Sequence, residues 1–120
     1  MGDKLKITKR SIKGYDFIDI SGNIMLEGSK EIVKFVKKTT GGKDKDIYLN
    51  FDGVSYVNSS ALSMILQMVR DLSSKKVNIF LMNVNDKILS LIKIAGLHNY
   101  FKFVSDEAAL IEKIDKEDTN

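Results

Sequence analysis

The chain has 120 residues, 43% of them hydrophobic and 29% charged, which predicts one soluble globular domain spanning residues 1–120. The formal net charge of +3 comes from dispersed lysines, which argues against a nucleic-acid partner, and the lack of cysteine excludes disulfides and thiolate chemistry. No apolar run reaches the roughly 18 residues of a membrane span, and the N-terminus lacks a secretory signal pattern. We therefore expect a cytoplasmic protein with no membrane partner.

The first half of the chain is predicted to begin with two strands. Apolar and polar residues alternate in residues 5–10 and 15–21, and a turn at 11–14 joins these segments into a hairpin. Helical spacing then predicts a helix over residues 26–38, which Gly41 is expected to end. A third strand is predicted at residues 46–51.

The second half of the chain repeats the alternation of helix and strand. After a central helix that ends near Leu72, a nearly continuous apolar run predicts a strand at residues 77–82. Asn85 is expected to cap a helix over 86–95, with Gly96 as its left-handed stop. The remaining elements are a short strand at 100–104, a helix over 106–114 capped by Ser105, and a polar segment from 115 that frays, with 116–120 as a disordered tail.

This order of elements predicts an α/β fold. Strands that alternate with helices form right-handed crossovers and a mostly parallel sheet, and the first hairpin adds an antiparallel strand. The expected architecture is a mixed sheet flanked by about four helices. Because ligands and partners of such sheets meet the carboxyl ends of strands, the segment 51–60 is the expected functional region.

The helix that follows this segment starts with three small polar residues. Asn58, Ser59 and Ser60 are suited to cap it, because their oxygens can accept hydrogen bonds from free backbone N–H groups. The same N–H groups and the helix dipole also favour a phosphate on a serine there. The local sequence leaves two interpretations open: a modified binding site, or serines that only cap the helix.

Catalytic interpretations find little support in the sequence. A small serine hydrolase could use Ser59 or Ser60 as its nucleophile, but the only candidate base is His98 and no Gly-x-Ser-x-Gly elbow is present. Acidic residues are dispersed without metal-ligand spacing, and phosphate-binding and dinucleotide fingerprints are absent. We therefore expect no catalytic residues, no metal and no cofactor.

The segment Asn50-Phe51-Asp52-Gly53-Val54-Ser55-Tyr56-Val57-Asn58-Ser59-Ser60-Ala61-Leu62 resembles the STAS family, the sulfate-transporter and anti-sigma-factor-antagonist domain. It is similar to the family's strand, Gly-Val pair and Asp-Ser-Ser-Gly-Leu phosphorylation motif. The segment 81–85 followed by 91–97 resembles the family's strand–Asn–helix–Gly-Leu segment, and Gly22 matches the glycine that ends the second strand. The resemblance covers essentially the whole chain.

The resemblance implies an α/β domain that binds partners and is not an enzyme. Bacterial stand-alone members bind an anti-sigma factor that is also a GHKL-type serine kinase, and phosphorylation of the motif serine breaks that complex. The motif serine falls on Ser59, its neighbour on Ser60 and the preceding acid on Asn58. The implied function is that of an anti-sigma factor antagonist in partner switching, a monomer acted on by this kinase and by a serine phosphatase. The alternative within the family is a phosphorylation-independent module of a sensory or transporter complex.

Three positions depart from the family pattern: Asn58 replaces the motif Asp, Ala61 the motif Gly, and Met25 an acid after the second strand. Asn58 can still cap the helix but brings no negative charge. On the predicted helix, Ala61, Met64 and Met68 form a strip roughly 100° from the sheet-facing residues. We expect this strip to bind the partner together with Asn58 and Ser60, because Met suits adaptable interfaces. The alternative is that the methionines pack under a neighbouring helix.

Overall fold

The strands lie in the sheet in the same order as they occur in the chain. The computed structural model describes residues 4–41, 44–104 and 107–118. The strands are β1 (Lys6–Ile12), β2 (Tyr15–Ile24), β3 (Lys45–Val57), β4 (Val77–Met82) and β5 (Lys102–Val104). The helices are α1 (Leu26–Thr40), α2 (Ser59–Ser73), α3 (Asp86–Ile94) and α4 (Glu107–Asp118), with a 3-10 turn η1 (His98–Tyr100).

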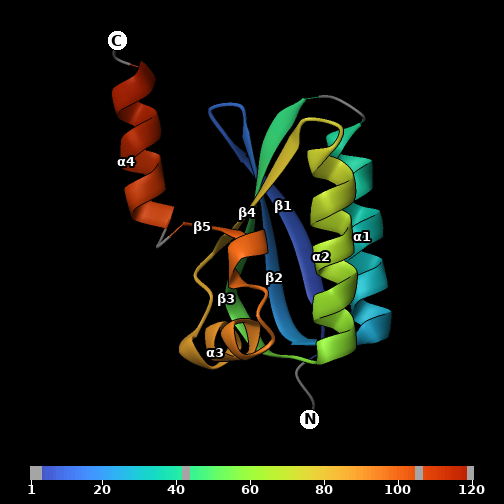
Figure 1. Ribbon diagram of the computed structural model, residues 1–120. Coiled ribbons are helices and arrows are strands. Elements are labelled where there is room, and N and C mark those ends of the chain that lie inside the picture. Colours follow the sequence, from blue (N-terminus) through green and yellow to red (C-terminus); the bar gives the residue numbers. More distant parts are fainter. Residues whose placement is uncertain (1–3, 42–43, 105–106, 119–120) are drawn as a thin grey trace.

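The sheet is mixed, as predicted. β1 pairs antiparallel with β2, and the other three pairings are parallel. Each parallel strand lies next to the one that precedes it in the chain, always toward the same edge of the sheet. Because such crossovers are right-handed, their helices lie on the same face. Accordingly, α1 and α2 lie side by side on one face, while α4 lies on the opposite side (Figure 1). Helix α4 follows the last strand, so it is not a crossover helix, and it is the helix that covers the second face of the described sheet.

Successive side chains of a strand point to opposite faces of the sheet, and both sets contain buried residues because both faces carry helices. Ile18 and Leu49 are fully buried in the core cluster that includes α1 and α2. Their neighbours Phe17 and Tyr48 point to the other face and pack with Leu110 of α4. On that face the Tyr48 ring stacks against Phe17, with ring centroids 5.2 Å apart, and against Phe80 on its other side at 5.0 Å. These stacked rings form the surface on which α4 rests.

Several strand boundaries differ from the sequence prediction. β1 ends at Ile12 instead of at residue 10, and β2 continues through Gly22, the glycine expected to end it, as far as Ile24. β3 continues beyond Phe51 to Val57 because β2 remains paired with it as far as Ile24, across two irregularities in register. β4 leaves the sheet earlier, since its last pairing joins Met82 to Asn50. The carboxyl ends of β2 and β3 therefore extend as a pair beyond the rest of the sheet. β5 begins at Lys102 because Tyr100 belongs to η1.

The C-terminal helix is longer than predicted. We expected a frayed segment from 115 and a disordered tail over 116–120, but α4 continues to Asp118. The segment contains no Gly or Pro to stop a helix, and Lys116 lies one turn from Glu112, with Nζ and Oε1 3.7 Å apart. The expected cap Ser105 lies outside the described residues.

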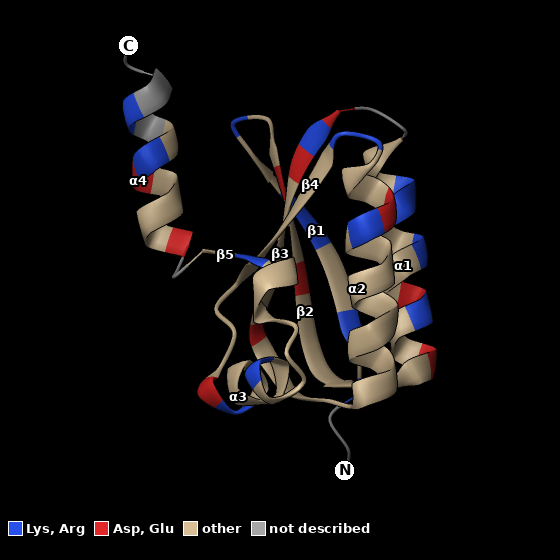
Figure 2. Ribbon diagram, viewed as in Figure 1, with Lys and Arg blue, Asp and Glu red and all other residues tan. Residues whose placement is uncertain are grey.

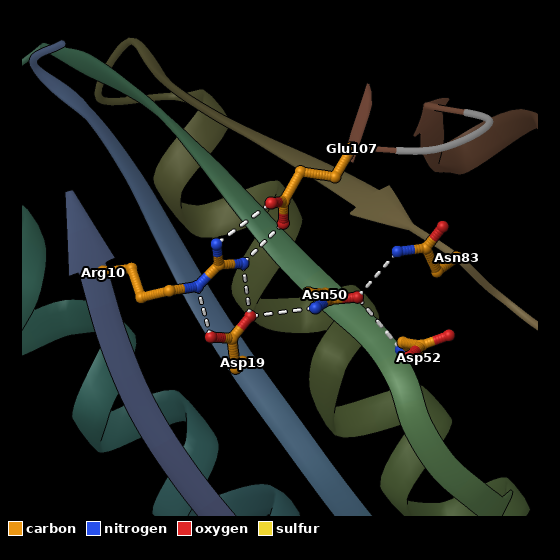
Figure 3. Close-up of polar contacts among 6 residues, drawn as sticks. All are labelled: Arg10, Asp19, Asn50, Asp52, Asn83 and Glu107. Carbon is orange, nitrogen blue, oxygen red and sulfur yellow. Dashed lines mark hydrogen bonds and ion pairs between the residues drawn. The ribbon is translucent and has the colours of Figure 1, made fainter. Parts of the chain in front are cut away.

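A polar network holds the start of α4 against the sheet (Figure 3). The Arg10 guanidinium donates to both carboxylate oxygens of Glu107, one at 3.0 Å, and to both oxygens of Asp19, one at 2.8 Å. Asn50 also donates to Asp19, at 2.9 Å. The hydrogen bond from Arg10 lowers the pKa of Asp19 below its ordinary value; partial burial opposes this shift, and the bond from Asn50 adds to it. The network links Glu107 of α4 to three strands, through Arg10 of β1, Asp19 of β2 and Asn50 of β3.

We expect Asp19→Asn to make stability less dependent on pH in acid. A carboxylate whose pKa is lower in the folded state stabilises the fold above its unfolded pKa of about 3.9, and that contribution is lost as pH falls through the folded pKa. The free energy of unfolding of the wild type should therefore exceed that of the variant at pH 7. The difference should shrink as the pH falls from about 4 toward 2.

The control for this measurement is Asp52→Asn. The exposed Asp52 carboxylate makes no ion pair with any residue that the structure describes, so its replacement should leave the acid titration close to wild type. The wild type could instead exceed Asp19→Asn in free energy of unfolding by the same amount at pH 7 and in acid. That result would show that the ionised Asp19 carboxylate does not stabilise the fold.

Candidate functional site

The start of α2 is fixed to the end of the extended β2–β3 pair. Asn58 is the N-cap, and its side-chain oxygen accepts a hydrogen bond from the Ala61 N–H at 2.8 Å, as predicted. Its own backbone N–H donates to the Ile24 carbonyl at the end of β2, at 3.1 Å. The Asn58 side-chain amide also lies 3.4 Å from the Met25 sulfur. One residue therefore ties the helix start to both the strand pair and the start of α1.

Replacing Asn58 with alanine should lower the free energy of unfolding by about 1 kcal/mol, because the Ala61 N–H loses its acceptor. Chemical denaturation of both proteins measures this change. Asn58→Asp is the matched control, because aspartate keeps the acceptor oxygen and adds a negative charge that the helix N-terminus favours. A loss in Asn58→Asp equal to that in Asn58→Ala would contradict the assignment of the cap.

Ser59 and Ser60 form the first turn of α2, and both are exposed. Neither hydroxyl makes a hydrogen bond with another described side chain or backbone group, so both are accessible from solvent. The segment around them, residues 53–69, contains no charged side chain. In Figure 2 charges line α1, whereas α2 is uncharged until its last turns. A phosphate on either serine would therefore introduce a charge into an uncharged part of the helix.

The expected methionine strip is wrong for two of its three residues. Ala61 is fully buried and Met68 is 1% exposed, in the same core cluster as Ile32 and Val36 of α1. The physical reason is that α2 packs against α1 as well as the sheet, so a second strip of its circumference is covered. Met64 is half-buried. Met68→Asp would therefore bring a charge into the core and disrupt the fold rather than test partner binding.

Other apolar side chains, which the sequence analysis did not expect to bind a partner, are exposed near the start of α2. Met25 is 46% exposed, Tyr56 is 44% exposed and Ile94 is 85% exposed. Tyr56 and Ile94 line an apolar groove of about 270 Å³ between the end of β3 and α3. We call it the α3 groove; its lining also includes Val57, Ile88 and Leu91. The sequence contained one signal of this exposed surface. The helix over 86–95 has more apolar residues than one stripe facing the core needs, so some of them must lie outside the core.

Asn85 holds α3 in the place that creates this groove. Its side-chain oxygen accepts from the Ile88 N–H at 2.8 Å, which confirms the predicted cap. Its side-chain amide donates to the Val54 carbonyl of β3 at 3.1 Å. Because β4 has already ended at this level, that carbonyl lies on an edge of β3 without a neighbouring strand. The oxygen of the Asn85 side chain therefore caps α3, while its nitrogen gives the Val54 carbonyl a hydrogen bond that no described strand provides.

The requirements of a hydrolase are not met by this arrangement. His98 lies in η1 and lines a different cavity, and among the described residues it makes no hydrogen bond to Ser59 or Ser60. His98 is therefore not placed to take a proton from either hydroxyl. In the part of the chain that the structure covers, no three metal-ligating side chains gather. None of the described helices is long and apolar enough to cross a membrane.

The fold agrees with a known family. A model of the STAS domain matches residues 6–110, and the chain belongs to this family. Over 80 residues the chain is 32% identical to an anti-sigma-B factor antagonist of Staphylococcus aureus, which covers 67% of this chain and 74% of the relative.

Two solved structures share the fold at low sequence identity. The Bacillus cell-fate determinant SpoIIAA in its phosphorylated form is 17% identical, with a TM-score of 0.64, over 92% of this chain and 99% of that one. The murine anion transporter Slc26a9 is 17% identical, with a TM-score of 0.73, over 88% of this chain and 18% of the transporter. The same architecture therefore occurs in a phosphorylated stand-alone protein and within a transporter.

Proposed function

We propose that this chain is an anti-sigma factor antagonist that acts by partner switching in transcriptional control. In the unphosphorylated state it binds an anti-sigma factor that is also a GHKL-type serine kinase, and this binding frees the sigma factor. Phosphorylation of Ser59 ends the binding, and a serine phosphatase restores it. The proposal describes a cytoplasmic monomer without catalytic activity of its own.

The observation that carries this proposal is the position of Ser59. Its hydroxyl is exposed at the first residue of α2, within the uncharged segment 53–69, and exposed apolar side chains lie nearby. A kinase that phosphorylates Ser59 must cover this surface, so the docking site and the phosphorylation site coincide. The named Staphylococcus aureus relative supports the anti-sigma factor as the partner.

The partner surface in this proposal differs from the expected methionine strip. Asn58, Ser60 and the half-buried Met64 remain on it, while the α3 groove and Met25 replace the buried Ala61 and Met68. Tyr56 is suited to anchor an interface, because aromatic residues with a polar tip dominate binding energies. The partner should therefore present apolar side chains to the groove beside the bound Ser59.

Phosphate on Ser59 would end binding through electrostatics and desolvation. It adds a charge of about −1.5 to −2, and the nearby residues 53–69 contain no arginine or lysine to pair with it. The helix N-terminus tolerates the anion in the free protein, but a docked apolar partner would remove its water. The free form is therefore favoured over the complex.

A second candidate function is a STAS module that binds partners without phosphorylation. The fold shared with part of the Slc26a9 transporter favours it, as does Asn58 in place of the motif Asp. In this function Ser59 is a structural residue of the first turn of α2 and is not phosphorylated. The partner would then be a subunit of a sensory or transporter complex.

Intact mass and site-mapped phosphorylation of the protein isolated from its own cells test these alternatives. A population heavier by one phosphate, located at Ser59, would support the switch. Absence of phosphate across growth and stress conditions would favour the phosphorylation-independent module. Turnover of generic esters that is lost in Ser59→Ala would overturn both and favour the hydrolase.

A further inference from the structure

A second cavity lies on the other side of α3 from the α3 groove. It has a volume of about 380 Å³, which is within the range of small-molecule sites. Most of its wall is apolar and includes Leu81 and Val84, Leu89 of α3, and Phe103 of the edge strand β5. Phe103 is 40% exposed, so an aromatic ring on this wall remains open to solvent.

The polar part of the wall is basic. Lys93 and His98 line the cavity, and its lining contains no acidic residue. Neither side chain makes a hydrogen bond or ion pair with any residue in the described ranges. Lys93 follows Leu89 by four residues on α3, so the two lie on the same face of the helix, one turn apart. The cavity thus combines an apolar wall with a cationic group that has no partner among the residues described.

We propose that this cavity binds a small amphipathic carboxylate, with its apolar body against Leu89 and Phe103 and its carboxylate at Lys93 and His98. Buried Leu81 forms the apolar interior, where a hydrocarbon body loses contact with water. The carboxylate gives the Lys93 ammonium a charged partner, which none of the described residues provides. The proposal does not depend on Ser59 or on the partner-switching function.

Calorimetric titration of the full chain with decanoate, below the concentration at which decanoate forms micelles, tests this site. We expect saturable one-to-one binding. Lys93→Gln should weaken it about tenfold, because a charge-assisted hydrogen bond is lost. Phe103→Ala should also weaken it, and 1-decanol should bind at least about tenfold more weakly than decanoate.

Lys87→Gln is the matched control, because Lys87 belongs to the same helix but lines the α3 groove instead. It should leave decanoate affinity unchanged. Absence of saturable binding would overturn the proposal. So would equal affinities for decanoate and decanol, or an equal loss in Lys87→Gln and Lys93→Gln, since either result would indicate nonspecific binding to apolar or basic surface.

Discussion

Replacing Ser59 with glutamate should weaken binding of the cognate anti-sigma factor about 100-fold or more, as measured by titration with the purified partner. The change places a negative charge at the start of α2, within the uncharged segment 53–69 that the partner is proposed to cover. The free protein should not lose stability, because an acidic residue in the first turn of a helix is favourable by about 0.3–1 kcal/mol. Loss of binding without loss of stability is the expected signature of the switch.

Two variants control for this experiment. Ser59→Ala removes the hydroxyl without adding charge and should bind the partner like the wild type. Ser73→Glu adds the same charge at an exposed position at the far end of α2 and should also bind normally. If Ser59→Glu bound with wild-type affinity, the docking surface would have to lie elsewhere on the molecule.

Gly53→Ala should destabilise the fold by about 1–3 kcal/mol, which chemical denaturation can measure. Gly53 pairs with Ser21 where the register between β2 and β3 shifts. An added Cβ would lie 2.6 Å from the Ser21 Cβ and 3.2 Å from its Cα, so the backbone of β2 would have to move. The damage would also reach the strand pair that carries Asn58 and the start of α2.

Gly28→Ala is the matched comparison for this substitution. There the added Cβ would meet the end of the Leu5 side chain at 2.9 Å, and a flexible side chain can turn away. Alanine in place of a glycine inside α1 also favours the helix by up to about 1 kcal/mol. We therefore expect stability within about 1 kcal/mol of wild type; a loss equal to that of Gly53→Ala would contradict the backbone explanation.

Much of the fold was predictable because it is determined by local signals. Apolar periodicity gave the order of strands and helices, and short polar side chains located the caps at Asn58 and Asn85. As expected, Gly41 ends α1 and Gly96 follows α3, and both glycines have a positive φ. These features depend on neighbours within a few residues, which the sequence displays directly.

The remaining features depend on which elements meet in space. Asp52, Gly53 and Ser55 interrupt the strand pattern, and only continued pairing with β2 keeps that part of β3 extended. Burial of Met68 follows from the position of α1 beside α2. Arg10 and Glu107 are far apart in the chain, and no local pattern predicts that they pair.

The agreement between sheet order and chain order also affects how the molecule can assemble. Each new strand adds to the edge formed by the preceding one, and paired residues of the parallel strands are fewer than about 35 positions apart in sequence. The contact order is therefore modest for a parallel sheet, and the entropy of closing long loops is kept small. Folding can proceed from the N-terminal hairpin outward while the ribosome is still extending the chain, and β5 and α4 join last.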